Sequence, residues 1–244
     1  MVGGEKRIRL DIALTRRRLV ATRSQAESWI KLGKITVDGE VVTKSSRLVD
    51  AQSDIKITAE TQYVSRAGLK LESVAKVLGL DFRDKIVLDV GSSTGGFTDY
   101  ALRNGAKLVY AVDVGTDQLH PKLRGNNRIE LHEKTDIRDF KLNEAPDIVV
   151  IDVSFISLRD ILPHIAGELA DSHTQIVAML KPQFEAGREQ INKGIIKNDA
   201  MRRQILRDFE EWAKKYFVII NKRDSDVAGA KGNQERFYLL KEVK

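Results

Sequence analysis

Residues 88–98 read Leu-Asp-Val-Gly-Ser-Ser-Thr-Gly-Gly-Phe-Thr, a glycine-rich turn between an apolar strand pattern and a helix pattern. Glycine has no Cβ, so Gly91, Gly95 and Gly96 allow the backbone to turn tightly and to approach a ligand closely. Asp113 ends the next apolar run, where a carboxylate can accept hydrogen bonds from ribose hydroxyls. The pattern therefore indicates a nucleotide-cofactor site at the carboxyl end of a parallel sheet.

Two classes of cofactor use a turn of this kind, dinucleotides and S-adenosylmethionine. Two features favour S-adenosylmethionine. Asp89 stands just before the turn, where an acid can meet the amino-acid end of the cofactor. Residues 217–240 hold two strand patterns that no helix pattern separates, which predicts an antiparallel pair at the end of the sheet. From these residues alone, a dinucleotide-dependent oxidoreductase remains an open alternative.

The chain from residue 65 onward alternates helix and strand patterns. Its strand patterns are continuous runs rich in Val and Ile, which are typical of parallel sheets covered on both faces. We therefore predict an α/β fold with a Rossmann-like, mostly parallel sheet of seven strands. The expected strands are residues 86–89, 108–113, 129–132, 147–152, 175–180, 217–222 and 236–240, with helices over 65–78, 158–169 and 198–214.

The first 60 residues predict a small α+β module. Residues 8–18 have apolar spacing near that of a helix, and Ser24 with Glu27 forms a capping-box pattern that would open a second helix. Asp38-Gly39 is a strong hairpin turn between two short strand patterns, and residues 54–57 predict one more strand. We expect an N-terminal domain at residues 1–60, a linker at 61–64 and a second domain at 65–244.

The positive charge of the chain is concentrated near its start. Lys and Arg number 41 against 35 Asp and Glu, a net charge of +6. Residues 5–34 contain nine basic and three acidic residues, so this segment carries the whole excess. A concentrated basic face suits a polyanion, and RNA is favoured over a solvated helix face or a membrane-surface helix. The candidate RNA-binding residues are Arg7, Arg9, Arg16, Arg17, Arg18, Arg23, Lys31 and Lys34.

Composition excludes several chemistries. The chain has no cysteine, which rules out disulfides, thiolate metal sites and cysteine nucleophiles. Its four histidines show no i, i+4 pair, so we expect no metal site. No apolar run approaches the ~18 residues of a membrane helix, and the first ten residues lack a secretory signal. We therefore expect a cytoplasmic protein.

Four stretches resemble the TlyA family of ribosomal RNA 2′-O-methyltransferases, whose members are often called haemolysins: residues 63–71, 89–98, 111–115 and 181–185. The N-terminal pattern resembles the S4-like RNA-binding domain. The resemblance implies a methyltransferase domain like that of FtsJ. It implies S-adenosylmethionine as cofactor and 2′-O-methylation of a cytidine in ribosomal RNA. It implies ribosomal RNA or a ribosomal subunit as partner, with no membrane and no obligate protein partner.

The resemblance also implies which residues form the site. A Lys-Asp-Lys-Glu catalytic set would comprise Lys70, Asp152, Lys181 and Glu235. The expected cofactor site comprises Asp89, Gly91, Ser92, Ser93, Thr94, Gly95, Gly96, Phe97, Asp113, Asp136 and Ile137, with Asp136 near the adenine amino group.

Residues 183–197 are long for a structureless connection and predict a mobile substrate lid.

The chemistry of this set leaves the role of Lys181 open. A ribose 2′-hydroxyl is a weak acid and a poor nucleophile, so the reaction needs proton removal and alignment. A nearby cation such as Lys70 would favour the neutral amine, which can act as a general base, whereas Asp152 and Glu235 would favour the ammonium. The alternative is that Lys181 stabilises charge while water takes the proton.

Two further functions remain as alternatives at this stage. One is a non-catalytic RNA-binding or ribosome-assembly factor whose methyltransferase fold is vestigial. The other is a membrane-active haemolysin, although the sequence offers neither a spanning helix nor the strand alternation of a barrel.

Overall fold

The structure is a computed structural model that describes residues 7–20, 23–58, 63–187, 189, 191–192, 194–196, 198–229 and 232–242. The chain divides into two compact units, Met1–Gln62 and Tyr63–Lys244. Within the described residues, no helix combines the length and the apolar character needed to cross a membrane.

The second unit is built on a seven-stranded sheet in the order β13-β14-β10-β9-β6-β7-β8. Strands β6 to β10 run parallel, whereas β14 is antiparallel to both of its neighbours, β10 and β13. The Rossmann-like α/β fold and the terminal antiparallel pair are thereby confirmed. The strands are β6 (Ile86–Val90), β7 (Leu108–Val112), β8 (Ile129–His132), β9 (Ile148–Ile151), β10 (Gln175–Leu180), β13 (Phe217–Asp224) and β14 (Arg236–Glu242).

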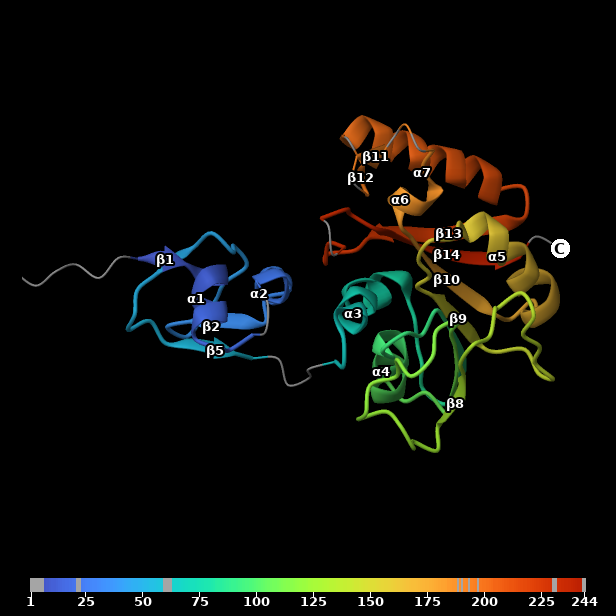
Figure 1. Ribbon diagram of the computed structural model, residues 1–244, viewed down its shortest axis with the longest axis horizontal. Coiled ribbons are helices and arrows are strands. Elements are labelled where there is room, and N and C mark those ends of the chain that lie inside the picture. The colour runs from blue at the N-terminus through green and yellow to red at the C-terminus, as the bar shows by residue number, and fades with distance from the viewer. Residues whose placement is uncertain are drawn as a thin grey trace, which may run out of the picture. The chain divides into compact units, whose positions relative to one another are not determined.

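Helices cover both faces of this sheet, which explains why its strands are apolar throughout (Figure 1). On one face α3 (Arg66–Leu78) and α4 (Gly96–Arg103) bury a cluster that includes Leu71, Phe97 and Phe237. On the other face α5 (Leu158–His164), its π-helical continuation Ile165–Leu169 and α7 (Asp199–Ala213) bury Leu162, Phe209 and Tyr238.

The direction of β14 brings its first residues to the edge where the parallel strands end. Leu180, the last residue of β10, pairs with Arg236, the first residue of β14. The next positions outward along the two strands are Lys181 and Glu235. Two charged residues that lie 54 positions apart in the sequence therefore emerge side by side at the carboxyl edge of the sheet.

The segment expected to be a lid contains regular structure in its described part. It begins with α6 (Pro182–Glu185) and continues into a hairpin of β11 (Ile191–Asn192) and β12 (Ile195–Ile196). Asn233 ties the hairpin to the start of β14, because its Nδ2 donates to the Gly194 carbonyl at 2.9 Å and its Oδ1 accepts from the Ile196 amide at 3.1 Å.

The first unit has a three-stranded sheet in the order β3-β2-β5 and a separate β1–β4 pair. The hairpin turn is as expected, because Asp38 and Gly39 adopt φ values of 54° and 85°, as a type I′ turn requires. The elements are β1 (Ile8–Arg9), α1 (Leu10–Arg16), α2 (Arg23–Lys31), β2 (Ile35–Val37), β3 (Glu40–Val41), β4 (Leu48–Val49) and β5 (Ile55–Ile57).

Three details of the first unit correct the sequence-based expectations. Ile8 belongs to a strand that pairs with β4, a strand the sequence analysis missed, so the first helix begins only at Leu10. Helix α2 begins at Arg23, so Ser24 lies inside the helix and is not its N-cap. Glu27 instead forms an ion pair with Arg23 at 3.2 Å.

Asp11 is the charged centre of the first unit. Its side chain is fully buried, and its carboxylate accepts hydrogen bonds from Arg9 at 2.9 and 3.0 Å and from Arg23 at 2.8 Å. Burial raises the pKa of Asp11, but the hydrogen bonds from both arginines outweigh it and hold that pKa below its ordinary value. Asp11 therefore joins the starts of α1 and α2 as an anion.

We predict that Asp11→Ala destabilises the first unit by about 2–3 kcal/mol, because both arginines lose a buried partner. Urea unfolding in a Trp212→Phe background measures this change, since Trp29 is buried in the first unit and then reports on it alone. Asp54→Ala is the matched control: its side chain is exposed and its loss should cost less than about 0.5 kcal/mol. Equal stability of the two variants would contradict the account.

Candidate active site

The glycines of the turn are required by close packing within the protein. Gly91 has a φ of +79°, and a Cβ there would lie 2.8 Å from the Asp152 carbonyl oxygen. A Cβ on Gly96 would lie 2.6 Å from the Ala67 Cβ, and one on Gly95 would collide with Leu123. These positions therefore let the turn after β6 approach the end of β9, the start of α3 and a neighbouring loop.

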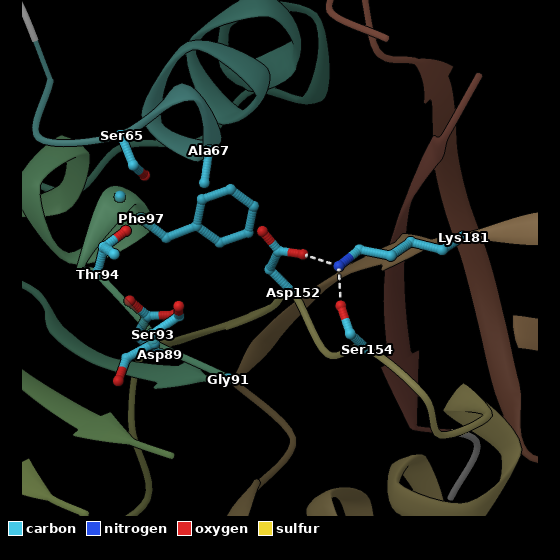
Figure 2. Close-up of a pocket in the computed structure, with 12 residues that line it drawn as sticks. Ser65, Ala67, Asp89, Gly91, Ser93, Thr94, Phe97, Asp152, Ser154 and Lys181 are labelled. Atoms are coloured by element: carbon cyan, nitrogen blue, oxygen red, sulfur yellow. Dashed lines mark hydrogen bonds and ion pairs between the residues drawn. The ribbon is translucent and has the colours of Figure 1, made fainter. Parts of the chain in front are cut away.

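Two adjoining cavities open beside this turn and share Gly91, Ser93, Asp152 and Ser154. The first has a volume of about 140 Å³, and Figure 2 shows its lining. It is completed by Ser65, Ala67, Asp89, Ser92, Thr94, Gly96, Phe97 and Lys181. The second has a volume of about 360 Å³, and its lining includes Val112, Asp113, Asp136, Ile137 and Phe155. Of the expected cofactor residues, only Gly95 lines neither cavity.

Asp89 offers an unsatisfied carboxylate oxygen at the first cavity. Its Oδ2 accepts hydrogen bonds from the Thr98 amide at 2.9 Å and the Thr98 hydroxyl at 2.6 Å. Its Oδ1 is buried and has no hydrogen-bond partner among the described residues. Burial raises the pKa of Asp89 to about 7. A buried, unpaired carboxylate oxygen that lines a cavity fits a cationic amino group.

Two other acids shape the second cavity. Asp113 accepts hydrogen bonds from the Ser93 amide at 2.8 Å and the Gly115 amide at 2.7 Å, which fixes its carboxylate at the end of β7. Asp136 forms an ion pair with Arg138 at 2.6 Å, and hydrogen bonds from Arg138 lower the pKa of Asp136 to about 2. Asp136 is therefore held as an anion at the wall of the cavity, and Asp113 is fixed there by its two hydrogen bonds.

Lys181 lines the first cavity and contacts two residues that follow β9 and line both cavities. Its Nζ lies 2.6 Å from Asp152 Oδ1 and donates a hydrogen bond to Ser154 Oγ at 2.8 Å (Figure 2). Both charged side chains of the ion pair are mostly buried, with exposed fractions of 11% and 15%. The geometry holds one ammonium group at the carboxyl edge of the sheet.

Lys70 and Glu235 form a second ion pair, 2.6 Å from Nζ to Oε2. Lys70 lies in the second turn of α3, and the Glu235 side chain is almost fully buried. Neither residue lines the two cavities described above. The four residues expected to be catalytic therefore meet as two ion pairs, and the pairing of β10 with β14 places Glu235 beside Lys181.

Several residues of this site were not among those predicted from the sequence. Ser65 and Ser154 line the first cavity, and Phe155 lines the second with 91% of its surface exposed. Phe155 has a φ of 65°, which is rare for a bulky residue, and its ring centre lies 5.0 Å from that of Phe184. Ser65 lies within a quoted motif, residues 63–71, whereas no local pattern signals the exposure or the positive φ of Phe155.

The structure sorts the candidate RNA-binding residues of the first unit into three groups. Arg9 and Arg23 are bound to Asp11, and Arg17 donates to three backbone carbonyls of residues 50–53 at 2.7–2.9 Å. Arg7 is exposed and lies in the electrostatic field of Asp50, and Lys34 is half-buried. Within the described part of the chain, the exposed side chains of Arg16, Arg18 and Lys31 make no hydrogen bond or ion pair. The last three are therefore the cations most available to a polyanion.

Comparison with known proteins matches both units. Residues 63–242 match the FtsJ-like methyltransferase family, and residues 8–55 match the S4 domain. Hemolysin A of Brachyspira hyodysenteriae is 40% identical over 93% of this chain and 97% of its own length. The 16S/23S rRNA (cytidine-2′-O)-methyltransferase TlyA of Mycobacterium tuberculosis is 33% identical over 97% of this chain and 90% of its own length.

A solved structure from Streptococcus thermophilus that carries a hemolysin name is also similar. It is 40% identical, has a TM-score of 0.71, and the match covers 98% of this chain and 89% of that one. The similarity thus extends over both units in sequence and in fold. The chain belongs to the TlyA family, in which an S4 domain precedes an FtsJ-like methyltransferase domain.

Proposed function

We propose that this chain transfers a methyl group from S-adenosylmethionine to the 2′-hydroxyl of a cytidine ribose in ribosomal RNA. The observation that carries the proposal is the Lys181 ammonium, which Asp152 and Ser154 hold at the wall of the first cavity. The name of the similar TlyA protein supports the choice of nucleotide. In this proposal residues 1–60 bind RNA and residues 65–244 carry out the transfer.

The residues present suit the two ends of S-adenosylmethionine. The unpaired Oδ1 of Asp89 would hold the amino group of its methionine part in the smaller cavity. Asp113, Asp136 and Ile137 would hold its adenosine part in the larger cavity, where apolar walls adjoin two acidic side chains. When bound, the cofactor supplies a methyl group activated by a positively charged sulfur.

The lysines would act on the ribose oxygen. The contact of Lys181 with Asp152 at 2.6 Å stabilises the charged ammonium, so we assign Lys181 to hydrogen bonding and charge stabilisation at the 2′-oxygen. Water then takes the hydroxyl proton. Lys70, paired with buried Glu235, adds a second cation at the same edge. Asp152 and Glu235 fix the two ammonium groups before the substrate arrives, which lowers the cost of alignment.

We predict that Lys181→Ala slows methyl transfer to ribosomal RNA by at least about 100-fold while cofactor affinity changes less than about threefold. The measurement is uptake of label from radiolabelled S-adenosylmethionine into isolated ribosomal subunits. Lys85→Ala is the matched control, because Lys85 forms a lysine–aspartate pair with Asp147 at 2.9 Å on the amino edge of the sheet. Its rate should equal that of the wild type.

Three outcomes would contradict the proposal. The first is that wild-type protein transfers no label to either ribosomal subunit or to naked ribosomal RNA. The second is that the label is found on a base instead of the ribose. Full activity of Lys181→Ala in cells, with RNA binding intact, would instead support a non-catalytic assembly factor.

We predict that cofactor binding strengthens as pH rises from 6 to 7.5, because the pKa of about 7 leaves Asp89 mostly neutral at the lower value. Only the carboxylate attracts the cofactor's ammonium, so affinity should rise about eightfold over this interval. Calorimetric titration with S-adenosylmethionine measures it. Asp89→Asn should bind weakly and without this pH dependence, and equal wild-type affinity at both pH values would refute the assignment.

We predict that the double variant Arg16→Gln, Arg18→Gln weakens RNA binding and makes its salt dependence shallower by about 1–2 in slope, because two exposed cations no longer displace counterions. Filter binding to ribosomal RNA at several salt concentrations measures the slope. Arg83→Gln removes an exposed arginine that pairs with Asp81 in the second unit and should leave the slope unchanged. An unaltered slope in the double variant would exclude these residues from the RNA interface.

A further inference from the structure

Glu185, the last residue of α6, has a buried carboxylate bound to another loop. Its Oε2 accepts a hydrogen bond from the Ser157 hydroxyl at 2.7 Å, and its Oε1 accepts one from the Leu158 amide at 2.6 Å. The side chain is only 2% exposed, and its Oε2 also forms an ion pair with Arg159 Nε at 3.6 Å. Burial raises the pKa of Glu185 above its ordinary value. Burying this acid is costly, and both of its oxygens are engaged in the contact.

The two loops that Glu185 joins carry the groups around the Lys181 ammonium. The loop after β9 holds Asp152 and Ser154, and both contact Lys181 Nζ. The segment after β10 begins with Lys181 and ends its short helix at Glu185. Glu185 therefore connects two segments: the loop after β9, which contacts the Lys181 ammonium, and the segment after β10, which contains Lys181. Its hydrogen bonds lie a few residues beyond these contacts along the chain.

A second contact joins the same loops. The rings of Phe155 and Phe184 lie 5.0 Å apart, and Lys181 Nζ lies 6.0 Å from the Phe184 ring centre. Phe155 holds a positive φ of 65°, a conformation that a bulky residue adopts only when its surroundings impose it. The hydrogen bonds of Glu185 to Ser157 and Leu158 restrain the chain just after Phe155 and so help to impose it.

We propose that Glu185 is a positioning residue: it holds the loop after β9 against the segment after β10, so that Asp152 and Ser154 hold the Lys181 ammonium in place. The inference rests on the proposed role of Lys181. The proposed role depends on the geometry of the two hydrogen bonds that the Glu185 carboxylate accepts. A glutamine can replace them, with its Oε1 accepting from the Leu158 amide and its Nε2 donating to the Ser157 hydroxyl.

The test compares Glu185→Ala with Glu185→Gln in the full chain. We expect kcat for methyl transfer to fall at least about 30-fold in the alanine variant and less than about threefold in the glutamine variant. The KM for RNA and the affinity and stoichiometry of S-adenosylmethionine should stay near wild type in both. An intact stoichiometry shows that a loss of folded protein does not cause the lower rate.

Three further variants separate positioning from stability. Glu168→Ala removes an exposed glutamate from the π-helical continuation of α5 and should be fully active. Thr174→Val removes a buried hydrogen bond to the Pro146 carbonyl at the amino edge of the sheet, and should lower stability without lowering kcat. In a Lys181→Ala background, Glu185→Ala should cause little further loss, because the group it positions is gone.

The inference is overturned if Glu185→Ala keeps the wild-type kcat, if Glu185→Gln is as impaired as the alanine variant, or if the losses from Glu185→Ala and Lys181→Ala are additive. Each of these results leaves the proposed function standing, since the wild type is active in all of them. An inactive wild type would instead overturn the proposed function, and the inference with it.

Discussion

The cost of burying a charge governs the arrangement of this site. Lys181 and Lys70 both lie largely inside the second unit, and each is held 2.6 Å from a carboxylate, that of Asp152 or of Glu235. A buried ammonium without such a partner would cost several kcal/mol, so neither lysine can be placed without its acid. The acids come from different strand ends, and Glu235 reaches this edge only because β14 runs opposite to β10. The antiparallel strand therefore positions a residue of the proposed site as well as completing the sheet.

The basic residues of the first unit have two roles. Asp11 and the carbonyls of residues 50–53 bind three arginines, so these side chains hold the small fold together. A module of about 60 residues buries little apolar surface, and charged hydrogen bonds near its centre add to a limited core. Arg16, Arg18 and Lys31 remain exposed on the same unit. A basic segment thus supplies both structure and a surface suited to a polyanion.

Sequence reasoning was strongest where chemistry follows from local pattern. The glycine turn, the strands rich in Val and Ile, and the Asp38-Gly39 hairpin were predictable because each depends on neighbouring residues. Partners distant in sequence were not predictable. Nothing near Arg17 indicates that it binds carbonyls more than 30 positions away, and nothing near Glu185 points to Ser157. The proposed catalytic set came from a family resemblance, and the structure adds its division into two ion pairs. The structure also shows why the turn needs glycines: Gly91 and Gly96 leave room for Asp152 and α3, rather than only for a ligand.

The most direct test of the account is a crystal structure of this chain with the demethylated cofactor and a ribosomal RNA fragment that contains the modified nucleotide. The account predicts that the ribose 2′-oxygen lies within about 3.2 Å of Lys181 Nζ, with the Asp152 and Ser154 contacts intact. A 2′-oxygen far from Lys181, or a base atom at the mouth of the cavity in its place, would contradict it.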